Sequence, residues 1–183
     1  MVDKQNEEAF GLALRAELSR IEEDATVTGK AHFNAADRWS RTHLWIGVPS
    51  ALLAAAAGAS AWKNQPEVAG ALALVSGAMT AVLTFLDPKS RHAAHHQAGA
   101  RFLALRNEAR LLRTVELLAT PPAALPDLVA RVKEIGSRYA DANAAGPLIP
   151  QHAYRRAIAG IAQGQARHAV DQPPPGPAGR PTA

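Results

Sequence analysis

The residues closest to a chemical site are three histidines, His92, His95 and His96. His92 and His96 are four positions apart, which on a helix places both imidazoles on one face at a spacing that can bind a divalent metal. No carboxylate at matching spacing supplies a further ligand, and the chain has no HExxH pattern. We therefore expect no metal at this cluster. Interfacial polar side chains and a pH-sensing role are the interpretations that remain open.

Other kinds of chemistry have even less support in the sequence. The chain has no cysteine, which excludes a thiolate nucleophile and a cysteine-based metal site. We find no Ser/His/Asp arrangement, phosphate-binding loop or pair of catalytic carboxylates. The isoelectric point near 9.8 is typical of nucleic-acid binders, but no recognition motif accompanies it. We expect a protein that is not an enzyme, needs no cofactor and binds no nucleic acid.

The elements that must position these residues are dominated by two runs without charge. No ionisable side chain occurs at 44–62 or at 68–86, and only the polar turn 63–67 separates the two runs. Each run has nineteen residues, which as a helix span roughly 28 Å, close to the hydrocarbon core of a bilayer. The alternative, a buried hairpin in a soluble bundle, normally keeps a polar stripe on each helix. The sequence predicts an all-α membrane protein with a two-span transmembrane hairpin.

The flanks of the runs predict their orientation. Trp45 and Trp62 lie near the two ends of the first run, where amphipathic rings favour the membrane interface, although core packing is the alternative. Arg38 and Arg41 precede the first run, and Lys89 and Arg91 follow the second. Because basic residues in short flanks favour the cytoplasmic side, both termini should be cytoplasmic.

Small residues at spacing four predict where helices pack closely, because lipid supplies no hydrophobic drive for helix association. One ladder of small residues occurs in each run: Gly47, Ala51, Ala55 and Ala59 in the first, and Ala69, Ala73, Gly77 and Ala81 in the second. Beside the second ladder, Ser76, Thr80 and Thr84 form a hydroxyl stripe. Each hydroxyl either bonds a carbonyl one turn back or faces a polar lumen. Two helices cannot enclose a lumen, so the second interpretation requires a homo-oligomer.

The rest of the chain predicts cytoplasmic helices on both sides of the hairpin. Residues 1–43 should form an amphipathic helix at about 4–24 and a second helix at about 27–43. Residues 87–168 should form three helices, one that begins at Asp87-Pro88 and ends near 118, one at about 126–143 and one at about 150–168. Arginines of the first of these, Arg106, Arg110 and Arg113, should pair with acidic residues of the N-terminal helix or lie near anionic headgroups. The Pro- and Gly-rich tail, 169–183, should be disordered.

The order of these features resembles a known family. It comprises a cytoplasmic helix, the pattern Lys30-x-His32-Phe33…Trp39…His43-Leu44-x-x-Gly47-x-Pro49, a short-looped hairpin, Asp87-Pro88, Phe102…Leu105…Glu108-x-Arg110 and Pro147-Leu-Ile-Pro150…Tyr154…Ala157. Over about residues 28–162 this resembles the SLATT domain, the SMODS and SLOG-associating two-transmembrane effector domain.

The resemblance implies an effector in the bacterial inner membrane that oligomerises into a pore, or perturbs the bilayer, in nucleotide-signal-linked antiphage conflict. No sensor domain is fused to this chain, so the resemblance implies a separate nucleotide-signalling sensor protein as a partner. Two alternatives stay open. One is a non-conducting membrane scaffold whose cytoplasmic helices bind a partner protein, and the other is a wholly soluble helical protein that binds a ligand or nucleic acid.

Overall fold

The computed structural model of the chain describes residues 2–119 and 125–166. Every regular element in these ranges is a helix, which confirms the all-α prediction. The tail for which disorder was predicted, 169–183, lies outside the described residues, as do Thr120 and the prolines after it.

The first element, α1 (Val2–Trp62), is a single helix of 61 residues. At 1.5 Å per residue it is about 90 Å long. The prediction of two separate helices before the first uncharged run was wrong. The predicted break near residue 25 contains neither proline nor glycine, and the Thr26 hydroxyl donates to the Glu22 carbonyl one turn back at 2.6 Å, so nothing there ends the helix.

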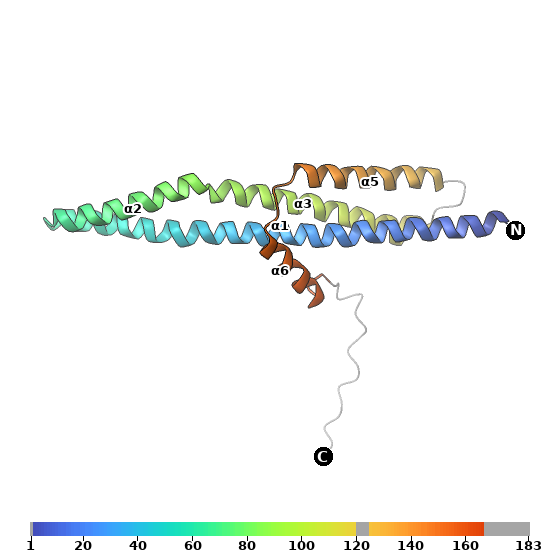
Figure 1. The fold of residues 1–183 in the computed structure, drawn as a ribbon, viewed down its shortest axis with the longest axis horizontal. Coiled ribbons are helices and arrows are strands. Elements are labelled where there is room, and N and C mark those ends of the chain that lie inside the picture. The colour runs from blue at the N-terminus through green and yellow to red at the C-terminus, as the bar shows by residue number, and fades with distance from the viewer. Residues whose placement is uncertain (1, 120–124, 167–183) are drawn as a thin grey trace, which may run out of the picture.

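Two helices run back along α1 (Figure 1). α2 (Pro66–Leu86) starts with proline at its first turn, where the missing N–H costs nothing. The turn before it is closed by backbone bonds from Lys63 to Ala59 and from Gln65 to Ser60, with Asn64 at a φ of 55°. α3 (Pro88–Leu111) follows after Asp87, which adopts the left-handed conformation and accepts a bond from the Ser90 amide. Both helix starts lie within two residues of the predicted ones.

Past α3 the helix widens for one turn, and the chain then turns back. A π-helical segment, η1 (Leu112–Glu116), and the short α4 (Leu117–Ala119) continue its direction. α5 (Leu125–Ala145) then packs on α3, and α6 (Gln151–Ala162) packs on α1. Figure 1 shows α5 beside α3 and α6 crossing α1 obliquely.

The apolar core lies entirely outside the two uncharged runs. It combines residues of α1, α3, η1 and α5: Leu14, Leu18, Ile21, Ala25, Phe102, Leu105, Ala109, Leu112, Leu128, Val132 and Ile135. Glycines bring α1 and α3 together beside it, since a Cβ added at Gly29 would lie 3.3 Å from the Phe102 Cβ. One added at Gly99 would lie 3.2 Å from the Gly29 carbonyl oxygen. The residues outside the runs therefore form a conventional helical bundle with its own buried core.

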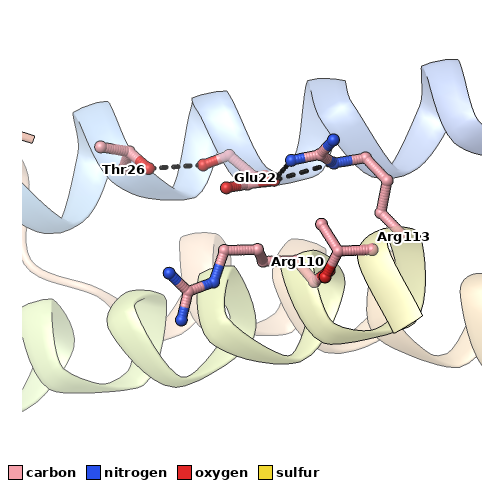
Figure 2. Close-up of polar contacts among 5 residues, drawn as sticks. Glu22, Thr26, Arg110 and Arg113 are labelled. Carbon is pink, nitrogen blue, oxygen red and sulfur yellow. Dashed lines mark hydrogen bonds and ion pairs between the residues drawn. The ribbon is translucent and has the colours of Figure 1, made fainter. Parts of the chain in front are cut away.

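Ion pairs tie this bundle together. Figure 2 shows the Glu22 carboxylate of α1 accepting from the Arg113 guanidinium, with a shortest distance of 2.8 Å. Arg138 of α5 pairs with Glu108 of α3 at 2.9 Å, and Arg131 of α5 pairs with Glu116. The predicted pairing of the arginine stripe with the acidic N-terminal helix is thus confirmed for Arg113.

Candidate functional site

Two helices are long and apolar enough to cross a membrane, and they carry the two uncharged runs. Their most apolar windows are only 11% and 6% buried. A helix that is apolar on all sides normally lies in the core of a soluble protein or in lipid. The described part of the chain leaves these apolar sides uncovered, so the two windows differ from the core helices of a soluble bundle.

Large apolar side chains cover the outside of both runs. Ten of them are exposed: Leu44, Trp45, Val48, Leu52 and Trp62 on α1, and Val68, Leu74, Val75, Val82 and Phe85 on α2. Exposure reaches 90% at Trp62 and 88% at Phe85. Burying a side chain of this size is worth about 1.5–3 kcal/mol, so leaving ten in water would be a severe penalty for a soluble chain.

Polar side chains lie on the inside, where α1 meets α2. Ser50 is 4% exposed and Ser76 is 6% exposed. The Ser76 hydroxyl donates to the Ser50 carbonyl at 2.8 Å, and the Ser50 hydroxyl lies 3.0 Å from the Ser76 carbonyl and 2.9 Å from the Thr80 hydroxyl. We call Ser50, Ser76 and Thr80 the hydroxyl seam. It satisfies its polar atoms within the contact between the helices, as a non-aqueous surrounding requires.

The residues at the contact between α1 and α2, including those of the hydroxyl seam, recur at alternating spacings of three and four. They are Ile46, Ser50, Leu53, Ala57 and Ser60 on α1, and Ala69, Leu72, Ser76, Met79 and Leu83 on α2. This spacing is typical of side chains that interdigitate between nearly antiparallel helices. Most residues of the predicted spacing-four ladders therefore lie on other faces of the two helices.

Of the eight residues in the two predicted ladders, only Gly47 and Ala69 are partly buried. Gly47 faces α2, where an added Cβ would lie 3.5 Å from Leu83 Cδ1, and Ala69 is partly buried. The other six ladder residues are exposed: Ala51, Ala55, Ala59, Ala73, Gly77 and Ala81. An added Cβ at Gly77 would meet nothing within 4 Å. These six do not pack α1 against α2, and a contact with another chain stays a prediction for them.

The hydroxyl stripe is used in two ways. Thr80 and Thr84 each donate to the carbonyl one turn back, at 3.0 Å, as the local interpretation predicts. Ser76 instead bonds across to α1. Thr80 and Thr84 are both exposed, but among the described residues only Thr84 makes no hydrogen bond to α1. Exposure to a polar lumen stays a prediction for this stripe.

The predicted interface anchors gather at the end of the hairpin opposite the turn, except Trp62. The Arg91 guanidinium lies 5.0 Å from the centre of the Trp39 ring and its Nε donates to the Leu86 carbonyl at 2.9 Å. Arg41 pairs with Asp37 at 2.9 Å, and Arg38 donates to a ring nitrogen of His152 at 2.8 Å. Lys89 is exposed, as are Trp45 and Trp62. The partners Trp39 and His152 were not predicted, because no spacing rule connects them to these arginines.

The three histidines point in different directions. His92 donates from Nδ1 to the Ala36 carbonyl at 2.9 Å, and His96 is exposed with its ring against Phe33. His95 is buried, and its Nδ1 lies 3.0 Å from Nδ1 of His32 on α1. In the described part of the chain, no group of three or more His, Cys, Asp or Glu side chains is placed to hold a metal ion.

The partner that sequence reasoning missed is His32. It is 2% exposed and stacks on Phe102, with ring centroids 5.6 Å apart. Burial, with a smaller effect from His95, lowers the pKa of His32 to about 4. Burial and then the charge of Arg91 lower the pKa of His95. Its position on the core-facing stripe of α1, two turns after Ala25, was the available signal.

Comparisons of the chain with protein-family models, with curated proteins and with solved structures each gave no match.

Proposed function

We propose that this chain is a two-span membrane protein, with 44–62 and 68–86 as antiparallel spans and both termini in the cytoplasm. The observation that carries the proposal is the inverted polarity of the hairpin. Its outside is covered by large apolar side chains, and its inside holds Ser50 and Ser76. A soluble helix pair has the opposite arrangement, whereas lipid favours this one.

The distribution of charge supports the orientation. Arg38, Arg41, Lys89 and Arg91 lie just before the first span and just after the second, so they face the same side of the bilayer. The turn at the other end carries only Lys63 and Glu67. Under the positive-inside rule the arginine-rich end is cytoplasmic.

Membrane extraction tests the first part of the proposal. The full-length chain, expressed in bacteria, should remain in the membrane pellet after carbonate washing and enter solution only with detergent. Recovery in the carbonate supernatant would overturn the membrane assignment.

The proposed activity is that of a self-associating effector that forms a pore or perturbs the inner membrane of a bacterium. The resemblance to the SLATT domain supports it, and so does the outward position of Ala73, Gly77 and Ala81, because exposed small residues at spacing four let a second chain approach closely. The same resemblance supports a separate nucleotide-signalling protein as the trigger and a role in antiphage conflict.

Dye influx into bacteria that express the chain tests this activity, with a matched pair of variants. Gly77→Leu fills the outward ladder, and Ala78→Leu adds leucine at the same depth beside it; both positions are exposed. We expect Gly77→Leu to abolish influx and Ala78→Leu to preserve it. Equal influx from both variants would remove the ladder from the mechanism, and absent influx from the unmodified chain with its trigger present would refute the pore.

The hydroxyl seam favours a second candidate, a non-conducting membrane scaffold whose cytoplasmic helices bind a partner protein. Ser76 is already bonded to Ser50 within one chain, which leaves fewer hydroxyls to line a lumen. A scaffold would retain its cellular effect in Gly77→Leu and lose it when the exposed surface of α5 is altered.

A further inference from the structure

The buried contact between His32 and His95 joins α1 to the start of α3. His95 lies eight residues after Asp87, about 12 Å along the helix from the bend that connects α3 to the second span. His32 lies twelve residues before the first span. In the proposed membrane arrangement, the pair therefore holds α3 against α1 just below the bilayer.

The hydrogen bond between the rings works in only some protonation states. The two Nδ1 atoms are 3.0 Å apart, so one must carry the proton and the other must offer its lone pair. A first added proton goes to an Nε2 and leaves this bond in place. A second added proton puts N–H on both Nδ1 atoms, which removes the acceptor and sets two cations against each other in a buried site.

We propose that the His32–His95 pair is a proton-released latch: with both rings charged, α3 separates from α1 at the base of the spans. Titratable or charged groups close to the pair include Arg91, His92 and His96 on α3 and Tyr139 on α5, which touches Phe102. In the described part of the chain, no ion pair joins a carboxylate to either ring.

Packing makes the contact sensitive to any ring displacement. His32 is stacked on Phe102 of the core, and its Nε2 would lie 3.6 Å from a Cβ added at Gly146, at the end of α5. His95 is buried against α1, and His92 on the same helix is bonded to the Ala36 carbonyl, so α3 is attached to α1 at both positions. In the proposed latch, charging the pair displaces this part of α3 and breaks both contacts.

The direction of the pH effect follows from the lowered pKa of both rings. The separated state, with water around each ring, takes up protons near the ordinary pKa of about 6.5. The closed state takes them up only at lower pH, about 4 for His32. The stability of the closed state relative to the separated state is therefore greatest above about pH 6.5 and decreases as the pH falls from there toward 4.

Pulsed electron resonance between two spin labels on the full-length chain in detergent or lipid nanodiscs measures the separation directly. The chain has no native cysteine, so His43→Cys on α1 and Ala93→Cys on α3 place the labels; both positions are exposed. Between about pH 7.5 and about pH 4, we expect the population with the longer distance to rise at least roughly two-fold. A distance distribution that stays constant over this range would overturn the latch.

Three variants separate the latch from general acid effects. The double variant His32→Leu with His95→Leu should stay closed at every pH, and His95→Gln, which has one ring left to charge, should open only at lower pH than the parent. His96→Gln removes the neighbouring exposed ring and should respond as the parent does. If the double variant does not fold, His95→Gln makes the same comparison. Opening of either substituted pair at the parent's pH would refute the proposal.

Whether the latch gates conduction rests on the proposed function. Acid-dependent dye flux through proteoliposomes, lost in His32→Leu with His95→Leu, would support both. A change in label distance without flux would support the latch and refute its role in gating conduction.

Discussion

Ser50 and Ser76 exchange hydrogen bonds at a position where a water-soluble helix pair would place leucine. In water such small hydroxyls contribute little to helix association, because the solvent competes for every bond. In lipid no such competitor exists, and interhelical hydroxyl bonds contribute about 0.6 kcal/mol on average and up to about 1.7. The lipid surrounding proposed for the apolar outer face of the hairpin would therefore also strengthen the bonds between Ser50 and Ser76.

We expect Ser76→Ala to weaken the contact between α1 and α2 by about 1 kcal/mol, since it removes the bond that the Ser76 hydroxyl donates to the Ser50 carbonyl, whereas the Ser50 hydroxyl keeps the Ser76 carbonyl and the Thr80 hydroxyl as partners. Reversible unfolding in mixed detergent micelles measures the change. Thr84→Ala is the control, because Thr84 bonds only its own helix, and should change the free energy of unfolding by less than about 0.5 kcal/mol. Equal effects of the two variants would show that the seam contributes nothing specific.

At the scale of elements, one stripe of α1 serves two partners. Its members recur at spacings of three and four, from Leu14 and Leu18 in the core to Ser50 and Leu53 in the run. The stripe meets α3 near the N-terminal half and α2 near the C-terminal half. Asp87 allows both α2 and α3 to pack on this stripe, because its left-handed backbone changes the chain direction between the two helices.

We expect Asp87→Ala to destabilise the fold by about 2 kcal/mol. Alanine loses the bond that the carboxylate accepts from the Ser90 amide, worth about 1 kcal/mol, and tolerates the left-handed conformation poorly, by about 1–2 kcal/mol. Asp87→Asn keeps both properties and is the matched control. Thermal unfolding of the two variants checks this; a loss in Asp87→Asn as large as in Asp87→Ala would instead assign the effect to the charge.

The helix ends were predictable, and the pairing faces were not. Pro66 and Asp87-Pro88 act locally, through a missing N–H and a capping carboxylate, so the sequence alone locates the starts of α2 and α3. The continuity of α1 depends on contacts with α3 and α5 that outweigh weak local preferences near Ala25. The ladders mark where another helix can approach closely, not which helix does so, and for this reason the contact through Ser50 and Ser76 was missed.

The histidines illustrate the same limit at the candidate site. Spacing on one helix relates His92 to His96, but the contact that forms joins His95 to a residue 63 positions earlier. Only the tertiary arrangement of α1 and α3 brings His32 within reach.

At the scale of the whole molecule, the chain consists of a bundle with a buried core and a hairpin with almost none. The two parts should depend on different surroundings. The bundle is stabilised by apolar burial around Phe102, and in the proposed membrane arrangement the hairpin is stabilised by transfer of its outer face into lipid.

We expect Leu74→Lys and Phe102→Ala to separate these contributions. Leu74 is 76% exposed near the middle of α2, so lysine there should weaken membrane insertion by about 3 kcal/mol and leave the bundle folded. Phe102 is fully buried, and its loss should destabilise the bundle by about 3–5 kcal/mol and leave membrane recovery unchanged. Carbonate extraction and circular dichroism of both variants measure the two effects. Loss of membrane recovery in Phe102→Ala alone would contradict the separation.

The unbroken course of α1 also fixes an angle. No residue between the bundle and the hairpin interrupts the helix. The outward direction of Ala51 and Ala55 is therefore fixed relative to the direction in which Leu18 points into the core. A torque on the bundle therefore turns the hairpin about the same axis. One residue added to α1 between 38 and 44 would rotate the hairpin by about 100° and raise it by about 1.5 Å, so the number of residues in α1 sets the direction that the hairpin faces relative to the bundle.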